Sequence, residues 1–465
     1  MSALLSDADL NDFISPGLAC VKPTQTLREK KPDNGEIEVG KEPTELEKVS
    51  ISLQDCLACA GCITSSEEIL LSRQSHTVFL KAWEELPAGV PLVVSIPPQC
   101  RLSLARFYEM TLEEFDGCFI GIMTKRFHAK YVVGTQLGRN IAVCETIKAL
   151  AEKKKDGDQV KPLLGAVCPG FVLYSEKTKP QLVPYLLDVK SPQQITGSLL
   201  KETCGKVYHL TIMPCFDKKL EASRKDGEGE VDCVITPREF VTMMQEVGID
   251  ISSYRVQAQV ESLQRACSPP GWDPLVHWAS NAGSSSGGYA YQYVLHQQSL
   301  HANSDIITIT GKNSDTREYR LVDSKTGATL ASASEVYGFR NIQNLVRKLI
   351  SPGSSNRNVK VLRKRTPAAA QKSASQQTGI VDASKTEFVE VMACPGGCIN
   401  GGGLLNGEQN STRRRALARD LDRQYHDQLR QVGCQENVSD TYKSYKYQFT
   451  AIASASDVVT VGNTW

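Results

Sequence analysis

The sequence carries almost no excess charge of either sign. Its 53 lysine and arginine residues are balanced by 52 aspartate and glutamate residues, which leaves a formal net charge of +1 at pH 7. Proteins that bind nucleic acid or anionic membranes usually show a basic surplus or a basic cluster. The overall charge therefore gives no argument for a nucleic-acid or membrane partner.

Long apolar runs and targeting signals are also missing. No stretch reaches the ~18 apolar residues that a membrane-spanning helix needs. The opening segment MSALLSDADLNDFISPGLAC is acidic, without the basic start and long apolar run of a signal peptide. It also lacks the arginine-rich, acid-poor composition of a transit peptide. We therefore expect a cytoplasmic protein, with the nucleus as a second location.

Two common catalytic patterns are not found. The segment GSSSGG, residues 283–288, lacks the Lys-Ser/Thr pair that completes a phosphate-binding loop. The seven histidines give no case for a Ser/His/Asp triad. The sequence thus offers no motif for nucleotide hydrolysis or for triad-based acyl transfer.

Cysteine, in contrast, is abundant, with 15 residues in a chain of 465. The number is odd, and a reducing compartment disfavours structural disulfides. Clustered cysteines in such a protein are typical of metal ligands, whereas isolated ones are commonly small buried hydrophobes. Seven cysteines lack local ligand context and are expected to be structural: Cys100, Cys118, Cys144, Cys204, Cys233, Cys267 and Cys434.

From about residue 90 the sequence alternates between strand and helix patterns. The strand-like runs VPLVVSIPP and KVYHLTIMPC alternate with helical runs such as IAVCETIKALAEKKK and FRNIQNLVRKLI. This alternation predicts α/β layers with largely parallel sheets. Residues 268–288 and 351–386 are expected to be loose, the latter as a surface insertion. Residues 412–430 are predicted to form a helix with a solvated arginine face and an apolar stripe of Leu417, Leu421, Tyr425 and Leu429.

The segment CLACAGC forms the first dense cysteine cluster. Cys56, Cys59 and Cys62 have C-x2-C-x2-C spacing, which lets three thiolates of one tight loop converge on an iron–sulfur cubane. Bacterial ferredoxins continue with x3-C-P, but Ser66 and Glu67 occupy those positions here. A fourth ligand must therefore come from elsewhere in the chain.

Cys20 is the preferred fourth ligand, because it stands in an otherwise cysteine-free N-terminus and is joined to the motif by a charged tether. Cys100 is a weaker candidate. Zinc also binds four thiolates, although its structural sites usually pair two short knuckles. Iron–sulfur is favoured over zinc, and a site without metal is the third alternative.

Three further segments place a cysteine beside proline or glycine at a turn. GAVCPGF carries Cys168, TIMPCFDKK carries Cys215, and FVEVMACPGGCINGGG carries Cys394 and Cys398. Their thiolates can meet in a buried cleft between lobes, where glycines permit close approach and backbone N–H groups can bond to cluster sulfurs. Considered singly, each segment is consistent with a structural turn, and for any one cysteine a role as a small buried core residue is slightly favoured.

Taken together, these segments resemble a known family. VCPGF, MPCFDKK and MACPGGCINGGG resemble, in order, the three signature segments of the iron-only hydrogenases, and SSSGGYAY resembles the glycine-rich segment before the third. Over roughly residues 10–435 the pattern is most similar to the hydrogenase-like cytosolic iron–sulfur protein assembly factors, also called the nuclear prelamin A recognition factor-like family.

The resemblance implies a fold, a cofactor set and three regions. The fold would be α/β, with two lobes of largely parallel sheets as in the iron-only hydrogenases and a small N-terminal cysteine-rich segment. The regions would be an N-terminal cluster segment with a flexible tether (1–76), a hydrogenase-like two-lobed region (77–435) and a C-terminal tail (436–465). Two [4Fe-4S] clusters are expected, the first on Cys20, Cys56, Cys59 and Cys62, and the second on Cys168, Cys215, Cys394 and Cys398.

The chain departs from the hydrogenases at positions that matter for their chemistry. Val167 stands where they have a proton-shuttling cysteine, and an isopropyl group neither donates nor accepts a proton. Leu404 and Leu405 replace the Gln-Pro that follows the glycines of the third signature. Lys218 matches the lysine that contacts the two-iron subsite, so a subsite is not excluded by that position.

The resemblance therefore implies a non-catalytic role in delivering [4Fe-4S] clusters to cytosolic and nuclear apoproteins. Partners would be an early scaffold complex and a late targeting complex of the assembly pathway. The C-terminal Trp465 resembles the tail by which pathway members dock on the targeting complex. A redox enzyme or electron carrier, and a zinc-stabilised interaction protein, are the alternative functions.

Overall fold

The structure is a computed structural model that describes residues 74–155, 162–227, 229–255, 259–311, 313–350, 376–378, 381–405, 411–433 and 445–451. Several predicted site residues lie outside these ranges, namely Cys20, Cys56, Cys59, Cys62, Cys434 and Trp465. What was predicted for them stays a prediction, as do the boundaries of the three regions.

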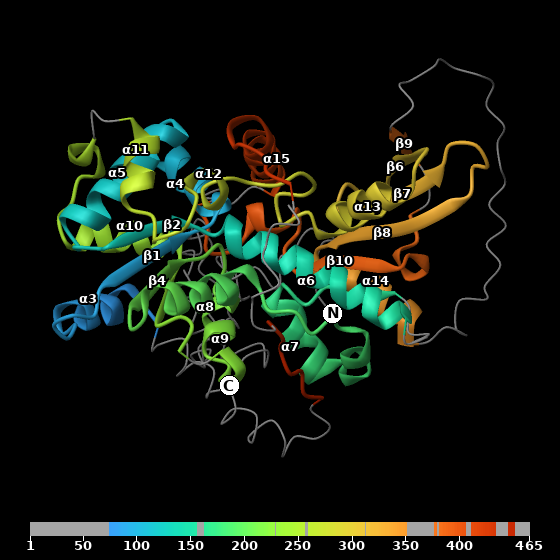
Figure 1. The fold of residues 1–465 in the computed structure, drawn as a ribbon, viewed down its shortest axis with the longest axis horizontal. Coiled ribbons are helices and arrows are strands. Elements are labelled where there is room, and N and C mark those ends of the chain that lie inside the picture. The colour runs from blue at the N-terminus through green and yellow to red at the C-terminus, as the bar shows by residue number, and fades with distance from the viewer. Residues whose placement is uncertain are drawn as a thin grey trace, which may run out of the picture.

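A four-stranded parallel sheet forms the centre of one half of the molecule (Figure 1). Its strand order is β2-β1-β4-β5, from β1 (Leu92–Ile96), β2 (Tyr131–Gly134), β4 (Tyr208–Ile212) and β5 (Cys233–Ile235). Every residue of β1 is buried, as expected where helices cover both faces of a parallel sheet. We call this half the four-stranded lobe.

A six-stranded mixed sheet forms the centre of the other half, the six-stranded lobe. Its order is β3-β10-β8-β7-β6-β9, from β3 (Leu163–Leu164), β6 (Ser304–Thr310), β7 (Thr316–Asp323), β8 (Thr329–Tyr337), β9 (Gln376–Thr378) and β10 (Phe388–Met392). Strands β3, β10 and β8 are parallel, β8, β7 and β6 form an antiparallel ladder, and β9 pairs parallel with β6. The predicted α/β fold with largely parallel sheets is confirmed, and the antiparallel ladder is an addition to it.

Among the described residues, seventeen short and long helical segments other than the last helix cover the two sheets or connect their strands. They are α3 (His76–Glu84), α4 (Pro98–Phe107), α5 (Leu112–Lys125), α6 (Gln136–Lys155), α7 (Pro169–Thr178), η2 (Pro180–Tyr185), α8 (Pro192–Cys204), α9 (Asp217–Ala222), η3 (Lys225–Gly227), α10 (Pro237–Glu246), η4 (Ile251–Tyr254), α11 (Val260–Ala266), α12 (Pro274–His277), α13 (Tyr289–Leu300) and α14 (Phe339–Ile350), followed by η5 (Ala383–Lys385) and η6 (Cys398–Asn400). In the part of the chain that is described, none of the helices combines the length and apolarity needed to cross a bilayer.

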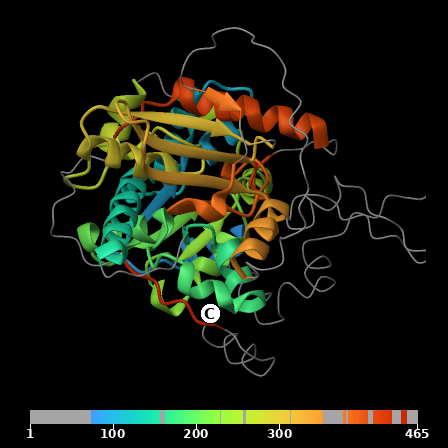
Figure 2. The same cartoon turned by 90° about the vertical axis from the view of Figure 1, so that its right-hand side faces the viewer.

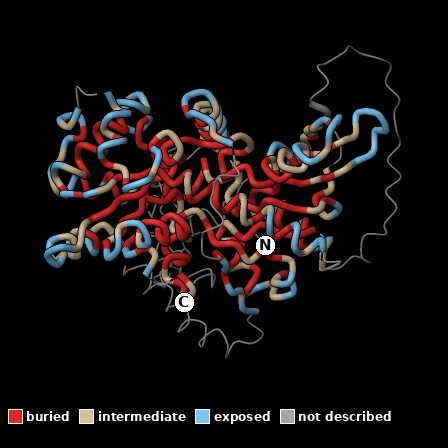
Figure 3. The backbone as a smooth tube through the Cα atoms, in the orientation of Figure 1, coloured by how far each residue is buried: buried red, intermediate tan, exposed pale blue. Residues whose placement is uncertain are grey.

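Helix α6 joins the two lobes through its core side chains. It directly follows β2 of the four-stranded sheet, yet Ile141 and Leu150 pack in one apolar cluster with Leu321 and Phe388 of the six-stranded sheet. Buried backbone runs through both lobes and through the region between them (Figure 3). The lobes therefore share packed side chains, and their junction is part of the protein interior.

The last helix, α15 (Ser411–Gln428), has the apolar stripe that the sequence predicted. Leu421, Tyr425 and Leu429 are buried and form a cluster with Leu102 of α4 and Ile399 of η6. The helix lies on the outside of the molecule above the junction of the lobes (Figures 1 and 2). It therefore covers the loop that contains Cys398.

Two segments expected to be loose carry regular structure. Within 351–386, residues Gln376–Thr378 form β9 and residues Ala383–Lys385 form a short 3-10 helix. Within 268–288, residues Pro274–His277 form α12, and most of the glycine- and serine-rich stretch from Ser284 onward is buried. In this second case the small residues pack closely in the interior, so the expectation of a loose segment, which rested on composition, was wrong for Ser284–Gly288.

Candidate functional site

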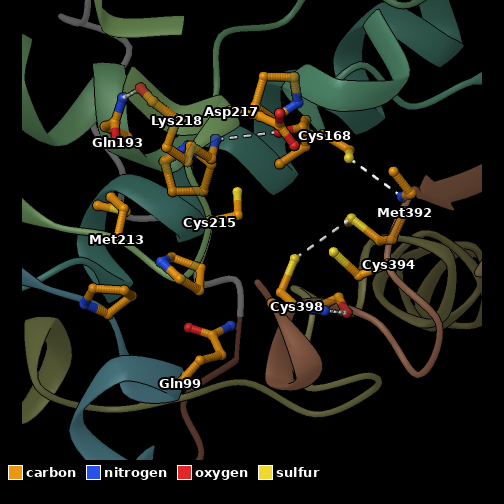
Figure 4. A pocket seen from close by; sticks show the side chains of 18 of the residues that line it. Gln99, Cys168, Gln193, Met213, Cys215, Asp217, Lys218, Met392, Cys394 and Cys398 are labelled. Atoms are coloured by element: carbon orange, nitrogen blue, oxygen red, sulfur yellow. Dashed lines mark hydrogen bonds between the residues drawn. The ribbon is translucent and has the colours of Figure 1, made fainter. Parts of the chain in front are cut away.

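A cavity between the two lobes is lined by all four cysteines of the predicted second cluster (Figure 4). It encloses about 680 Å³ of space free of protein atoms, including the part open to solvent. Cys168 follows β3 and precedes α7, Cys215 follows β4, and Cys394 and Cys398 follow β10. Open α/β sheets place their sites at the carboxyl ends of strands, and here two sheets contribute to one site.

Glycines allow the third segment to approach its neighbours closely. Gly397 has a φ of +82°, and a Cβ atom there would lie 2.2 Å from Ser286 Oγ. A Cβ atom on Gly401 would lie 2.3 Å from the carbonyl oxygen of Pro214, beside Cys215. No other residue fits either position without displacing a neighbour. The glycines around Cys394 and Cys398 thus bring one lobe against the other.

Backbone and side-chain groups fix the orientation of two of the cysteines. The Ala393 N–H donates to Cys168 Sγ at 3.3 Å, and the Cys398 N–H donates to Ser286 Oγ at 2.9 Å. The Cys398 thiol contacts Met392 Sδ at 3.7 Å (Figure 4). N–H groups directed at ligand sulfurs are a common means of holding and tuning a cluster.

Cys168 is buried and Cys215, Cys394 and Cys398 are half-buried around the cavity, and their removal from water raises the pKa of each thiol. The pKa of Cys168 is raised to about 12 by burial and then by the charge of Cys398. For Cys215 and Cys394 burial raises the pKa well above its usual range, and nearby Asp217 and the other cavity thiols raise it further. Four such groups stay neutral unless positive charge enters the cavity, and iron bound to the sulfurs supplies that charge.

The chemical type of the four side chains suits an iron–sulfur cluster. Among the described residues, no group of three or more His, Cys, Asp or Glu side chains converges closely enough to bind one metal ion. The four thiols instead surround a shared cavity, and soft thiolates are the donors that iron–sulfur clusters take. The residues present therefore fit a cluster, with Cys168, Cys215, Cys394 and Cys398 as its holders.

Lys218 lies at the cavity, but its charge is already compensated within the protein. Its ammonium group donates to Glu221 Oε1 and Oε2 at 3.0 and 2.9 Å, and to the Val167 carbonyl oxygen at 3.2 Å. Val167 itself lines the cavity with an aliphatic side chain. At this position the cavity wall has no group that exchanges protons.

Four polar side chains that no sequence motif contains also line the cavity. Gln99, Thr135, Arg139 and Gln193 are all nearly inaccessible to solvent. Each has one side-chain polar atom without a hydrogen-bond partner in the described structure: Gln99 Oε1, Thr135 Oγ1, Arg139 Nε and Gln193 Oε1. Figure 4 shows Gln99 and Gln193 on the side away from Cys168 and Cys394. Nothing in their local sequence marks these residues, because the tertiary fold alone brings them together.

The buried glycine- and serine-rich segment connects the two walls of the cavity. The Ser285 carbonyl oxygen accepts from Gln99 Nε2 at 2.5 Å, and Ser284 Oγ donates to Glu390 Oε1 at 2.8 Å. Ser286, as noted, accepts from the Cys398 N–H. The segment therefore links α4 of the four-stranded lobe to β10 and the third cysteine segment.

The described cysteines that were expected to be structural differ in their surroundings. Cys118, Cys204, Cys233 and Cys267 are free, and none of them lines the cavity. Cys100 is fully buried on α4, where burial and then the charge of Cys398 raise its pKa, so it lies near the second site. Cys144 is disulfide-bonded, which corrects the expectation that disulfides are disfavoured in this chain.

Comparison with known proteins agrees with this fold. Residues 90–402 match the family described as "Iron only hydrogenase large subunit, C-terminal domain". A variant of the apo [FeFe]-hydrogenase HydA1 from Chlamydomonas reinhardtii superposes with a TM-score of 0.59 at 19% identity, covering 81% of this chain and 99% of that one. At this identity the likeness shows the fold alone.

Curated relatives are much more similar and extend over the whole chain. The protein named "Cytosolic Fe-S cluster assembly factor NAR1" of Kluyveromyces lactis is 58% identical over 476 residues, with 100% of both chains covered. Proteins of the same name from Eremothecium gossypii and Saccharomyces cerevisiae are 56% and 53% identical, again over 100% of both chains. The chain therefore belongs to the family of cytosolic Fe-S cluster assembly factors that share the iron-only hydrogenase fold.

Proposed function

We propose that this protein takes part in the assembly of cytosolic iron–sulfur proteins and carries two [4Fe-4S] clusters, without catalysing a reaction of its own. The observation that carries the proposal is the cavity in which four thiols from three distant segments face one another, while Val167 stands beside them. The site can hold a cluster through its thiols, and the wall at Val167 offers no proton donor. Membership of the assembly-factor family supports the same role.

The two clusters would differ in how firmly they are held. In the second site Cys168 is buried and Cys215, Cys394 and Cys398 are half-buried, on turns that two packed lobes bring together around one cavity. The first site would use Cys20 together with Cys56, Cys59 and Cys62, with a charged tether between them. We therefore expect mild chelation or oxygen to remove the first cluster before the second, and the reverse order would contradict this assignment.

The protein would work in the cytosol between an early scaffold complex and a late targeting complex, and would also serve nuclear apoproteins. Trp465 would dock it on the targeting complex through an exposed aromatic ring and the chain-terminal carboxylate. Replacing Trp465 by Ala should then weaken co-purification with the targeting complex while both clusters remain bound. Retained co-purification would remove this part of the proposal.

The test of the whole proposal replaces one ligand of each site in the full-length protein. Cys59→Ser and Cys394→Ser are purified anaerobically, and iron, acid-labile sulfide and cubane EPR signals are counted. In cells lacking the wild-type protein, each variant is assayed for the activity of a cytosolic iron–sulfur enzyme. Each should lose about half of the roughly eight irons that two cubanes contain and fail to support the enzyme. Cys233→Ser, a buried free thiol away from the cavity, is the matched control.

A redox enzyme related to the iron-only hydrogenases is the second candidate, because the fold and Lys218 are present. Hydrogen evolution from reduced viologen by the anaerobically purified protein distinguishes the two. The aliphatic wall at Val167 predicts none. Sustained hydrogen evolution would favour the enzyme, and zinc without iron would refute both candidates.

A further inference from the structure

Arg139 is a buried cation at the cavity whose charge has no partner in the described protein. Its side chain is 4% exposed, and it lies in the first turns of α6, where it lines the cavity with Cys398. Nη1 donates to Tyr425 Oη at 2.8 Å, while Nε has no hydrogen-bond partner. Among the described residues, no carboxylate forms an ion pair with it.

The contrast with Lys218 shows how unusual this is. Both side chains line the same cavity, but Lys218 is held by both oxygens of Glu221 in a buried ion pair. Arg139 has only a neutral phenol as its partner. The buried carboxylate that feels its charge, Glu390, is occupied by hydrogen bonds from Ser284, Tyr337 and the Ala290 N–H. One of the two cavity cations is therefore compensated and the other is not.

An isolated buried cation is strongly unfavourable, so its counter-charge is expected inside the cavity. A cubane held by four thiolates carries net negative charge, and the cavity places Cys398 within the electrostatic reach of Arg139. The helices α4, α6, α7 and α8 also begin at the cavity, through Pro97, Thr135, Cys168 and Pro192, and their N-terminal ends add positive potential. These features describe a cavity prepared for an anion.

We propose, on the basis of the second cluster assigned above, that Arg139 is the positioning residue that neutralises this cluster and sets its reduction potential. The unpartnered Nε–H of the guanidinium faces no protein acceptor and is free to donate to a cluster or ligand sulfur. A positive charge beside the cluster favours the state with the extra electron, so it raises the reduction potential. Arg139 therefore stabilises the reduced form of a cluster that the protein holds but does not use catalytically.

Tyr425 holds the guanidinium in place from the outside helix. Its phenol accepts a hydrogen bond from Arg139 Nη1 and donates one to Asn281 Oδ1 at 3.3 Å. Tyr425 belongs to α15, and its ring is fully buried. Asn281 belongs to the same stretch as the serine that binds the Cys398 N–H. A loss of the Tyr425 hydroxyl should therefore loosen the guanidinium while its charge remains.

The experiment uses full-length protein carrying Cys59→Ser, so that any remaining cubane signal comes from the second site. EPR-monitored redox titration compares Arg139→Gln, Arg139→Lys and Tyr425→Phe with this parent. Arg139→Gln should lower the potential, Arg139→Lys should largely restore it, and Tyr425→Phe should lower it by a smaller amount. The control is Arg106→Gln, an exposed arginine on α4 paired with Asp420 at 2.8 Å, which should leave the potential unchanged.

Each result separates this inference from the function on which it rests. If the Cys59→Ser parent has no cubane signal, the proposed second cluster itself fails. If the signal is present and Arg139→Gln leaves the potential unchanged, or Arg139→Lys shifts it as far as Arg139→Gln does, the role of Arg139 is refuted. Should Arg139→Gln not fold, Tyr425→Phe still decides, since an unaltered potential there contradicts a fixed guanidinium.

Discussion

The two walls of the cavity differ in chemistry. The six-stranded lobe contributes the thiols of Cys168, Cys394 and Cys398. Segments that follow strands of the four-stranded sheet contribute one thiol, Cys215, together with the cations Lys218 and Arg139. One wall thus supplies most of the negative ligands and the other most of the positive charge. The site is complete only when the lobes are packed together, so cluster binding and lobe packing should depend on each other.

Removing one of the three thiols that the six-stranded lobe contributes should have the largest effect. We expect Cys168→Ser to abolish the second cluster and with it about half of the bound iron, because a hydroxyl is a poor ligand for iron–sulfur clusters. Iron and acid-labile sulfide counts on anaerobically purified protein measure this. Cys118→Ser, which removes a free thiol that does not line the cavity, provides the control. Equal iron contents of the two variants would contradict the assignment.

Removing the carboxylate that pairs with Lys218 should have the next largest effect, which is a loss of folding stability. Glu221→Gln leaves Lys218 buried without its carboxylate and also weakens the bonds that Glu221 accepts from Ser191 and Gln193. Removal of one partner of a buried pair costs roughly 3–5 kcal/mol of folding stability. Denaturant unfolding of the apo protein measures the loss.

The exposed pair Glu145–Lys148 on α6 is the matched control for this change. Glu145→Gln should alter stability by less than about 1 kcal/mol, because exposed ion pairs contribute little. A similar effect of the two substitutions would show that Lys218 is not a buried charge of consequence.

The glycine contacts that join the walls can be broken singly. Gly397→Ala places a methyl group against Ser286 Oγ at a positive φ and should cost about 1–3 kcal/mol. It should also lower the affinity for the second cluster, because Ser286 positions Cys398. Gly433→Ala, which has open space around its Cβ position, should be neutral in the same chelator competition.

Two buried groups, one in each lobe, should respond to pH in opposite directions. Burial lowers the pKa of His209 in the four-stranded lobe to about 4, so this lobe loses stability as the pH falls from about 6.5 towards 4. Burial, and then the charge of Glu390, raises the pKa of Glu335 in the six-stranded lobe to about 8. That lobe loses stability as the pH rises from about 4.5 through 8, because the folded state then gives up a proton it had retained.

Thermal unfolding of the apo protein across this pH range measures both the acid and the alkaline loss of stability. Glu335→Gln should reduce the decline on the alkaline side and leave the acid side unchanged, while Glu390 and Asp217, whose pKa values burial also raises, account for the remainder. An alkaline decline of full size in this variant would assign it to other groups.

Features set by local periodicity were accessible from the sequence. The run FRNIQNLVRKLI is α14 from its first residue to its last, and the apolar stripe of α15 packs as expected. The cysteine segments were found because cysteine, proline and glycine at turns are local signals. The structure places all four of these cysteines at one cavity.

Features set by tertiary contacts were not accessible. Strand β8 has no distinctive pattern, and the buried stretch around Ser286 resembled a loop because small residues suit both surface loops and tight packing. Arg139 looked like any basic residue of a helix, since its isolation depends on which carboxylates the fold brings near. Leu404 appeared only as a departure from the hydrogenase pattern, whereas in the structure it is buried in the core of the four-stranded lobe.

The most direct test of the shared site concerns Cys215, the one cavity thiol that follows a strand of the four-stranded sheet. Cys215→Ser and Cys233→Ser, two substitutions in the same lobe, are compared in full-length protein by iron content and EPR. A site built from both lobes predicts that Cys215→Ser loses the second cluster and that Cys233→Ser retains it. A full second cluster in Cys215→Ser would contradict the account.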